Sequence, residues 1–200
     1  QSEAASLSDL ATYFGGNLPM VTGRFYGIPA GSTQAAFTTV ISTLYAYPIY
    51  VPNDVTVSTL SVGCTTGQTG GACRLGIYAD TGAGYPGALV YDSGAVSGLT
   101  STTVVTKSSV ATTLQAGWYW LASIFTASST FPDVTSSTAI YASSLNSQLG
   151  ATTAAIALTV SAAATSGISV AATYGALPTT FTAGGAPRSN VSTPVVIMGV

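Results

Sequence analysis

The sequence predicts an all-β protein in which an antiparallel β-sandwich follows a short N-terminal arm. Runs of β-branched and aromatic residues are separated by glycine- or proline-containing turns about every eight to twelve residues, a spacing typical of sandwich strands. No helical pattern of useful length follows Phe14. Residues 118–125 are largely apolar at both parities, as expected for a central strand that is buried on both faces.

Residues 1–20 are expected to form the arm, and residues 21–200 the sandwich. Ser6 and Asp9 can cap a short helical segment, which a pair of glycines then ends. A flexible start and an arm that docks onto a neighbouring subunit both fit this pattern. The leucine, tyrosine and phenylalanine side chains of the arm favour docking.

The first predicted strands are 21–26 and 39–51. Pro48 lies near the end of the second strand, and because proline cannot donate a hydrogen bond to a sheet, that end is expected at an edge or a bend. Tyr45 and Tyr47 have the same parity in this strand. They are therefore expected to form an aromatic stripe, at a subunit interface rather than on a sugar.

The next predicted strand changes phase along its length. Val55 and Val57 share one parity, whereas Leu60 and Val62 share the other, which indicates a bulge near Ser58. A sheet tolerates such a change where one extra residue is inserted into a strand.

The following strand, 74–80, places Leu75 and Ile77 on one face and Tyr78 on the other. A turn rich in glycine then leads to the short strand 88–92. The remaining strands are expected at 101–114 (two strands or one broken strand), 118–125, 156–160, 168–170 and 195–198.

Cys64 and Cys73 bracket a glycine-rich segment between two strands. If these strands form a hairpin, a disulfide is geometrically feasible, and it would contribute about 2–3 kcal/mol by closing a short loop. The alternative is a pair of buried thiols that face each other, as in a protein that assembles in a reducing cytoplasm. Two cysteines without any histidine cannot complete a zinc site.

The charge content is unusually low. Only 5% of the residues are charged and the formal net charge is −2, whereas about a quarter of the residues of an ordinary domain are charged. A surface of this kind promotes association. We therefore expect much of it to be buried against identical copies or a larger particle. A secreted monomer hydrated by serine and threonine is the alternative.

Composition argues against several classes of partner and activity. Four basic residues cannot form the stripe that neutralises nucleic-acid phosphates. The most apolar long segment, 151–172, is made of alanine, threonine and serine rather than of strongly apolar residues, so no membrane span is expected. Without histidine, the commonest general base is absent. We expect no catalytic residue, no metal site and no cofactor.

Two aspartates and several aromatic residues are the remaining candidates for a site. Asp80 and Asp92 lie beside glycine turns, where aspartate bonds its own backbone, with a shared calcium ion as the alternative. Sugars bind aromatic faces that have polar neighbours. Tyr85, in a glycine-rich turn, and Tyr91 are the predicted glycan contacts. The aromatic residues also considered are Tyr50, Tyr78, Trp118 and Trp120, with core packing favoured for both tryptophans.

Three stretches resemble a jelly-roll-like β-sandwich module of tailed-bacteriophage fibres, spikes and appendages, which also occurs in some secreted bacterial domains. They are 74–80 (RLGIYAD), 85–92 (YPGALVYD) and 114–122 (LQAGWYWLA). The resemblance covers residues 54–125 and extends weakly to the closing strand.

The resemblance implies a non-enzymatic structural virion protein, in a tail or head fibre, spike or decoration, that can contribute to recognition of the host surface. Its partners would be identical subunits (a trimer by analogy with fibres), other virion proteins and host-surface glycan. Its location would be the virion, after assembly in the host cytoplasm. The alternative is a secreted, extracellular bacterial domain for carbohydrate binding or adhesion.

Overall fold

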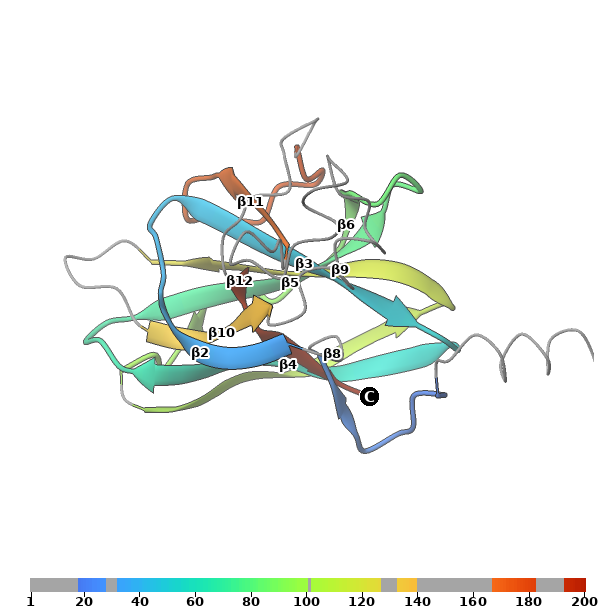
Figure 1. The fold of residues 1–200 in the computed structure, drawn as a ribbon, viewed down its shortest axis with the longest axis horizontal. Coiled ribbons are helices and arrows are strands. Elements are labelled where there is room, and N and C mark those ends of the chain that lie inside the picture. Colours follow the sequence, from blue (N-terminus) through green and yellow to red (C-terminus); the bar gives the residue numbers. More distant parts are fainter. Residues whose placement is uncertain (1–17, 28–31, 101, 127–132, 140–166, 183–192) are drawn as a thin grey trace, which may run out of the picture.

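The structure, a computed structural model, describes residues 18–27, 32–100, 102–126, 133–139, 167–182 and 193–200. These residues form strands and no helix, and the strands make two antiparallel sheets that pack face to face (Figure 1). The prediction of an all-β antiparallel sandwich is confirmed.

The sheet called sheet A here has the path β1-β13-β4-β10-β12, with β2 paired to β10 and β8 paired to β4. Its strands are β1 (Phe25–Tyr26), β2 (Ser32–Thr38), β4 (Val55–Thr66), β8 (Thr103–Leu114), β10 (Asp133–Ala139), β12 (Thr193–Pro194) and β13 (Val196–Gly199).

The other sheet, sheet B, has the path β11-β3-β9-β5-β6, with β7 paired to β5. Its strands are β3 (Thr43–Val51), β5 (Ala72–Asp80), β6 (Pro86–Asp92), β7 (Val96–Ser97), β9 (Gly117–Phe125) and β11 (Ile168–Ala171). The chain changes sheet at most steps, for example from β3 to β4 to β5 and from β7 to β8 to β9. Such crossing is typical of sandwiches with Greek-key connections.

The expected irregularity near Ser58 is present. The pairing of β4 with β8 shifts register between Val57 and Thr59, so that Ser58 faces the three residues 109–111 of β8. Ser109 and Ala111 have positive φ angles of 58° and 51°. The extra residues therefore lie in β8, and they direct Val110 into the core, where it is buried.

Pro48 lies at a sheet edge, as expected. On one side β3 pairs with β9 from residue 44 to residue 51, but on the other side its pairing with β11 ends at Ala46. From Pro48 onward, that side of β3 has no partner among the described residues. The missing N–H of proline therefore leaves the pairing of these strands intact.

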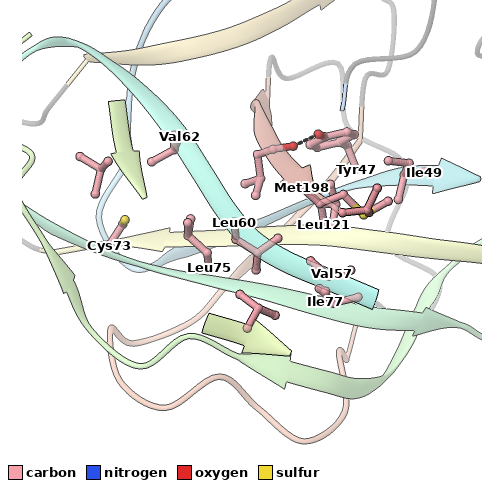
Figure 2. Packing of buried hydrophobic residues seen from close by; sticks show 14 of the residues in the cluster. Tyr47, Ile49, Val57, Leu60, Val62, Cys73, Leu75, Ile77, Leu121 and Met198 are labelled. Carbon is pink, nitrogen blue, oxygen red and sulfur yellow. Dashed lines mark hydrogen bonds between the residues drawn. The ribbon is translucent and has the colours of Figure 1, made fainter. Parts of the chain in front are cut away.

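The main core lies between the sheets and receives side chains from both (Figure 2). Leu75 and Ile77 point into it from β5, whereas Tyr78 of the same strand points to the outer face of sheet B, so the predicted parity is confirmed. Tyr47 spans the core, and its hydroxyl donates to the backbone carbonyl of Val196 on β13 (Figure 2).

A second apolar cluster covers the outer face of sheet B. Its buried members are Leu44, Ala46, Tyr78, Trp120, Ala122, Ile124, Ile168, Leu177 and Phe181. The last two come from residues 172–181, a non-repetitive segment called the strap here, which follows β11. Central strands of sheet B are thus buried on both faces, as the pattern of 118–125 predicts.

Several element boundaries differ from the sequence-based expectation. The strand expected at 21–26 is limited to β1, and the segment 39–51 contains a turn before β3 begins. The long strand 101–114 is a single broken strand, β8. The expected arm up to residue 17 and the alternating segment 156–160 lie outside the described residues.

Candidate binding surface on sheet B

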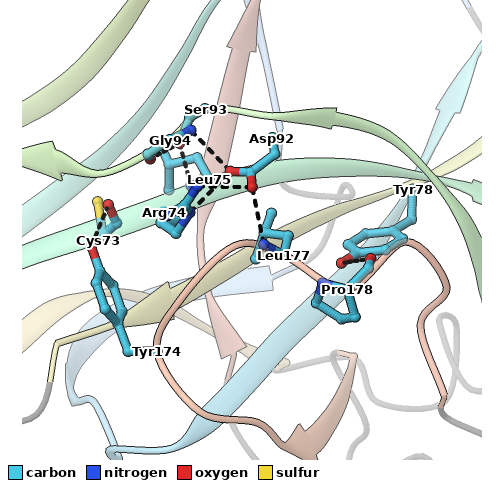
Figure 3. Close-up of polar contacts among 10 residues, drawn as sticks. All are labelled: Cys73, Arg74, Leu75, Tyr78, Asp92, Ser93, Gly94, Tyr174, Leu177 and Pro178. Atoms are coloured by element: carbon cyan, nitrogen blue, oxygen red, sulfur yellow. Dashed lines mark hydrogen bonds and ion pairs between the residues drawn. The ribbon is translucent and has the colours of Figure 1, made fainter.

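The polar network with the most partners joins the strap to sheet B (Figure 3). Arg74 on β5 donates from Nε and a terminal nitrogen to the carboxylate of Asp92 on β6, at 3.1 and 3.0 Å. The same carboxylate accepts the backbone N–H of Gly94 at 2.9 Å and that of Leu177 in the strap at 2.9 Å. Asp92 therefore connects two strands, its own turn and the strap.

The electrostatics of Asp92 match a structural role. Burial raises the pKa of its carboxyl, but the hydrogen bonds from Arg74 and from the N–H groups of Leu177 and Gly94 outweigh this effect and hold the pKa below its ordinary value. A carboxylate that stays ionised and is bonded on both oxygens is a poor general acid. The bond to Gly94 is the expected bond of an aspartate to its own turn.

Further contacts hold the strap along the outer face. Tyr78 donates its hydroxyl to the carbonyl of Pro178 at 3.0 Å (Figure 3). The Tyr78 ring also meets the ring of Phe181 edge-on at a centroid distance of 5.3 Å. The backbone N–H of Phe181 donates to Gly87, and that of Leu89 donates to Thr179, both at 2.9 Å. The strap thus crosses from the β11 edge of the sheet to β6.

Beyond the strap, the outer face of sheet B ends in an aromatic pair, a half-buried tyrosine and an exposed tryptophan. Tyr50 on β3 lies directly opposite Trp118 on β9, with ring centroids 5.2 Å apart and planes tilted by 58°. Trp118 is 43% exposed, whereas Trp120, two residues later on the same face, is fully buried. The expectation of core packing is therefore confirmed for Trp120 and wrong for Trp118.

Asp80 continues this pair onto the neighbouring strand. It follows Ala79, which pairs with Tyr119, so Asp80 lies beside Trp118 on β5. Its carboxylate accepts the indole N–H of Trp120 at 2.8 Å. Tyr50, Trp118 and Asp80, called the outer row here, thus lie side by side across β3, β9 and β5. The sequence signal for this row is weak, because its members come from three separate strand ends.

The other oxygen of Asp80 organises the turn that follows. It accepts the N–H groups of Gly82 at 2.6 Å and Gly84 at 3.4 Å, as expected for an aspartate beside a glycine turn. Asp80 and Asp92 bond different partners, Trp120 and Arg74 respectively. They also lie at opposite ends of the β5–β6 ladder, with Asp80 opposite Pro86 and Asp92 opposite Gly76, so the structure does not bring the two carboxylates together as a shared calcium ion would require.

The two tyrosines predicted as glycan contacts lie on opposite sides of sheet B. Tyr85 is half-buried against the outer cluster, whereas Tyr91 packs against the core between the sheets. The pairing of β5 with β6 shifts register between Ile77 and Tyr78, and this irregularity reverses the parity of β6. The structure therefore does not combine Tyr85 and Tyr91 into one site.

The subunit interface predicted at Tyr45 and Tyr47 is wrong. Both side chains point into the core between the sheets and are almost fully buried within one chain. The Tyr45 hydroxyl accepts the backbone N–H of Val40 at 3.1 Å, and Tyr47 donates to Val196. Burial raises the pKa of both phenols. Tyr45 and Tyr47 do lie on the same face of β3, as their shared parity predicts, but that face is the inner one.

Cys64 and Cys73 are both buried thiols, which is the second of the two sequence-based alternatives. The hairpin on which the disulfide prediction depended does not form, because β4 belongs to sheet A and β5 to sheet B. Cys64 donates to the carbonyl of Thr66 at 3.4 Å. Burial, with a smaller contribution from Cys64, raises the pKa of Cys73 to about 12, which keeps the reactive thiolate scarce.

A second exposed apolar region lies at the start of the described chain. Asn53 accepts the N–H of Met20 at 2.7 Å and donates to its carbonyl at 3.3 Å, and Met20 packs into the core. An open cavity of about 620 Å³ lies here, lined by Met20, Thr22, Gly23, Val200 and the residues around the start of β4. Leu18, Val21 and Phe25 of this segment are 87%, 57% and 66% exposed.

Metal ligands and membrane-spanning helices are two further features to consider in the described residues. No group of three or more His, Cys, Asp or Glu side chains in that part of the chain is placed to hold a metal ion. Within the same residues, no helix has the length and apolar character needed to cross a membrane.

Comparison with known proteins adds no family assignment, because no family model, curated protein or solved structure matches the chain. The resemblance to particle modules therefore rests on the sequence motifs alone.

Proposed function

We propose that this chain is a non-enzymatic structural protein of a bacteriophage particle, in which it associates with identical copies through residues 18–26. The resemblance of residues 54–125 to particle modules supports the particle assignment, and the observation that carries the association is a segment that is fixed in place yet apolar on its outside. Leu18, Val21 and Phe25 expose large apolar side chains within eight residues. Such clusters are typical of protein–protein contacts.

The backbone of this segment is bonded to the sandwich at several points. Gly23 donates to the carbonyl of Val200 at 2.6 Å, and Val200 donates to Arg24 at 3.1 Å. Phe25 lies opposite Gly199 in the short pairing of β1 with β13. A segment held in this way loses little conformational entropy when a partner covers its side chains.

The charges of the chain support association. Arg74 and Asp92 neutralise each other, and the carboxylates of Asp54 and Asp80 accept hydrogen bonds from the N–H groups of Ala116 and Trp120. Most of the described charges therefore serve contacts within the chain. With a formal net charge of only −2 over 200 residues, little electrostatic repulsion keeps copies apart.

The mass of the purified chain in solution tests association. We expect the wild type to have a multiple of the 19.9 kDa chain mass, with the trimer preferred, and the variant Leu18→Ser/Val21→Ser/Phe25→Ser to have the single-chain mass. Val104→Ser is the matched control, because Val104 is an exposed residue of β8. A wild type that stays monomeric at high concentration contradicts the proposal.

The particle assignment needs a separate test. Mass spectrometry of purified phage particles from the source of this chain should detect it in a fixed ratio to the capsid or tail proteins, and a labelled antibody should locate it by electron microscopy. Detection in the culture fluid of uninfected bacteria contradicts this assignment.

The second candidate is a secreted bacterial domain that binds carbohydrate or mediates adhesion. The pair of half-buried Tyr50 and exposed Trp118 favours it, because an aromatic surface beside polar groups is what a sugar requires. The two candidates share this surface, and the location of the native protein distinguishes them.

A further inference from the structure

We infer that the outer row of Tyr50, Trp118 and Asp80 binds a pyranose ring of a neutral oligosaccharide. This inference rests on the surface-recognition part of the proposed function and not on self-association. It assigns recognition to a surface that differs from the Tyr85 and Tyr91 contacts expected from the sequence.

The first element of the site is the stacking surface. The exposed indole of Trp118 and the ring of Tyr50 are adjacent and inclined to each other by 58°, so together they form a bent aromatic surface. The C–H groups on one face of a pyranose ring are apolar and pack on such a surface, while the hydroxyls at the ring edge stay available for hydrogen bonds.

The second element is the carboxylate of Asp80. Its oxygens accept the N–H groups of Trp120, Gly82 and Gly84, which fix its position beside Trp118. Each carboxylate oxygen has two lone pairs, so Asp80 can accept a further hydrogen bond from a ligand hydroxyl. A charged acceptor makes the stronger type of hydrogen bond to a hydroxyl.

The negative charge of the outer row favours neutral sugars over anionic ones. The outer row carries one negative charge and no positive one, and Arg74, the cation on β5, is already paired with Asp92. A uronic or sialic acid would place its carboxylate near Asp80 with no compensating cation among the described residues of the outer row, and like charges at short distance repel. Neutral hexoses and N-acetylhexosamines avoid this cost.

Rigidity is the third element. The row lies on β3, β9 and β5, which are consecutive in sheet B. Trp120, directly behind Trp118 on the same face, is fully buried and bonded to Asp80. Side chains on packed strands keep their geometry before the ligand arrives, so little ordering is needed on binding.

Titration calorimetry with defined tetrasaccharides tests the inference. The neutral probes are β-1,4-linked tetramers of glucose, N-acetylglucosamine and mannose, and the anionic probe is tetragalacturonic acid. We expect at least one neutral probe to bind and the anionic probe not to bind. Trp118→Ala should weaken binding by about tenfold or more, and Tyr50→Ala by a smaller factor. Trp118→Phe should retain part of the affinity.

Val104→Ala is the control, because it removes an exposed apolar side chain from β8 of sheet A, outside both the outer row and residues 18–26, and should leave sugar binding unchanged. Circular dichroism confirms that each variant is folded. The inference is overturned if none of the neutral probes binds, if Trp118→Ala binds as well as the wild type, or if the anionic probe binds best.

The mass in solution separates this result from the assembly proposal. If Trp118→Ala changes the oligomeric mass and no probe binds the wild type, the outer row is a protein contact and the inference is wrong. If sugar binding depends on Trp118 while Leu18→Ser/Val21→Ser/Phe25→Ser leaves the mass unchanged, assembly through residues 18–26 fails and the sugar site stands.

Discussion

Sheet B carries apolar side chains on both of its faces, whereas the outward positions of β4 and β8 in sheet A carry mainly threonine and serine. Across sheet A these hydroxyls bond each other, with Ser61 and Thr106 at 2.9 Å and Thr56 and Thr113 at 3.2 Å. A hydroxyl surface is wetted directly, but an apolar face needs a cover. The strap supplies this cover over part of sheet B.

Trp118 and Trp120 lie on either side of the limit of the area of sheet B that the strap covers. Both point to the outer face of β9, but Trp120 lies in the cluster that includes strap residues, and Trp118 lies beyond it. Parity therefore decides which face a side chain is on, while a segment distant in sequence decides whether that side chain is buried. The exposed end of an otherwise covered face is where a ligand can bind.

The largest effect is expected where the two tryptophans are compared directly. Trp120→Ala should lower the free energy of unfolding by about 3–5 kcal/mol, because it leaves a cavity under the strap and removes the donor to Asp80. Trp118→Ala should lower it by less than about 1 kcal/mol, since the side chain is half-exposed. Urea unfolding of both variants measures the difference, and equal losses would mean that the strap does not divide this face.

The next effect concerns the attachment of the strap. Asp92→Ala should lower the free energy of unfolding by about 2–4 kcal/mol, because Arg74 and the N–H of Leu177 lose their acceptor in a largely buried position. Asp54→Ala is the matched control: its carboxylate is exposed and accepts one backbone bond, from Ala116, so the loss should stay below about 1 kcal/mol. A small loss for Asp92→Ala would mean that apolar packing alone holds the strap.

Acid should weaken the same attachment in the wild type. Because the folded-state pKa of Asp92 lies below its ordinary value, its contribution is complete above about pH 4 and is lost as pH falls through the folded-state pKa. Below the unfolded-state pKa the unfolded chain binds the proton first, so the free energy of unfolding decreases. Asp92→Asn should show a flatter decline below about pH 4 in urea unfolding. Parallel curves for the two proteins would assign the acid sensitivity to other carboxylates.

Local patterns predicted much of the fold. The alternation of Leu75, Ile77 and Tyr78 gave the correct faces of β5, and the change of phase around Ser58 located a real irregularity. Both depend on neighbouring residues in one strand, which sequence periodicity reports directly. The edge position of Pro48 follows from the chemistry of a single residue.

What the sequence could not predict depends on partners far along the chain. Tyr45 and Tyr47 were correctly paired by parity, but the partner of Tyr47 is Val196, and no local signal identifies it. The supposed hairpin between Cys64 and Cys73 failed because the chain changes sheets there. The outer row was missed for the same reason: Trp118 is exposed because the strap covers only part of the face.

The smallest expected effect concerns sheet A, in its edge strand β8. Ala111 has a φ of 51°, a left-handed conformation that costs an L-residue roughly 1–2 kcal/mol and costs glycine almost nothing. Because glycine also gains entropy in the unfolded chain, Ala111→Gly should raise the free energy of unfolding by a net amount of about 0.5 kcal/mol. The nearby exposed Ser108 has no positive φ, so Ser108→Gly should lower it by about 0.5–1 kcal/mol. If both variants are destabilised equally, the irregular segment 109–111 does not strain β8. Its function would then be limited to directing Val110 into the core.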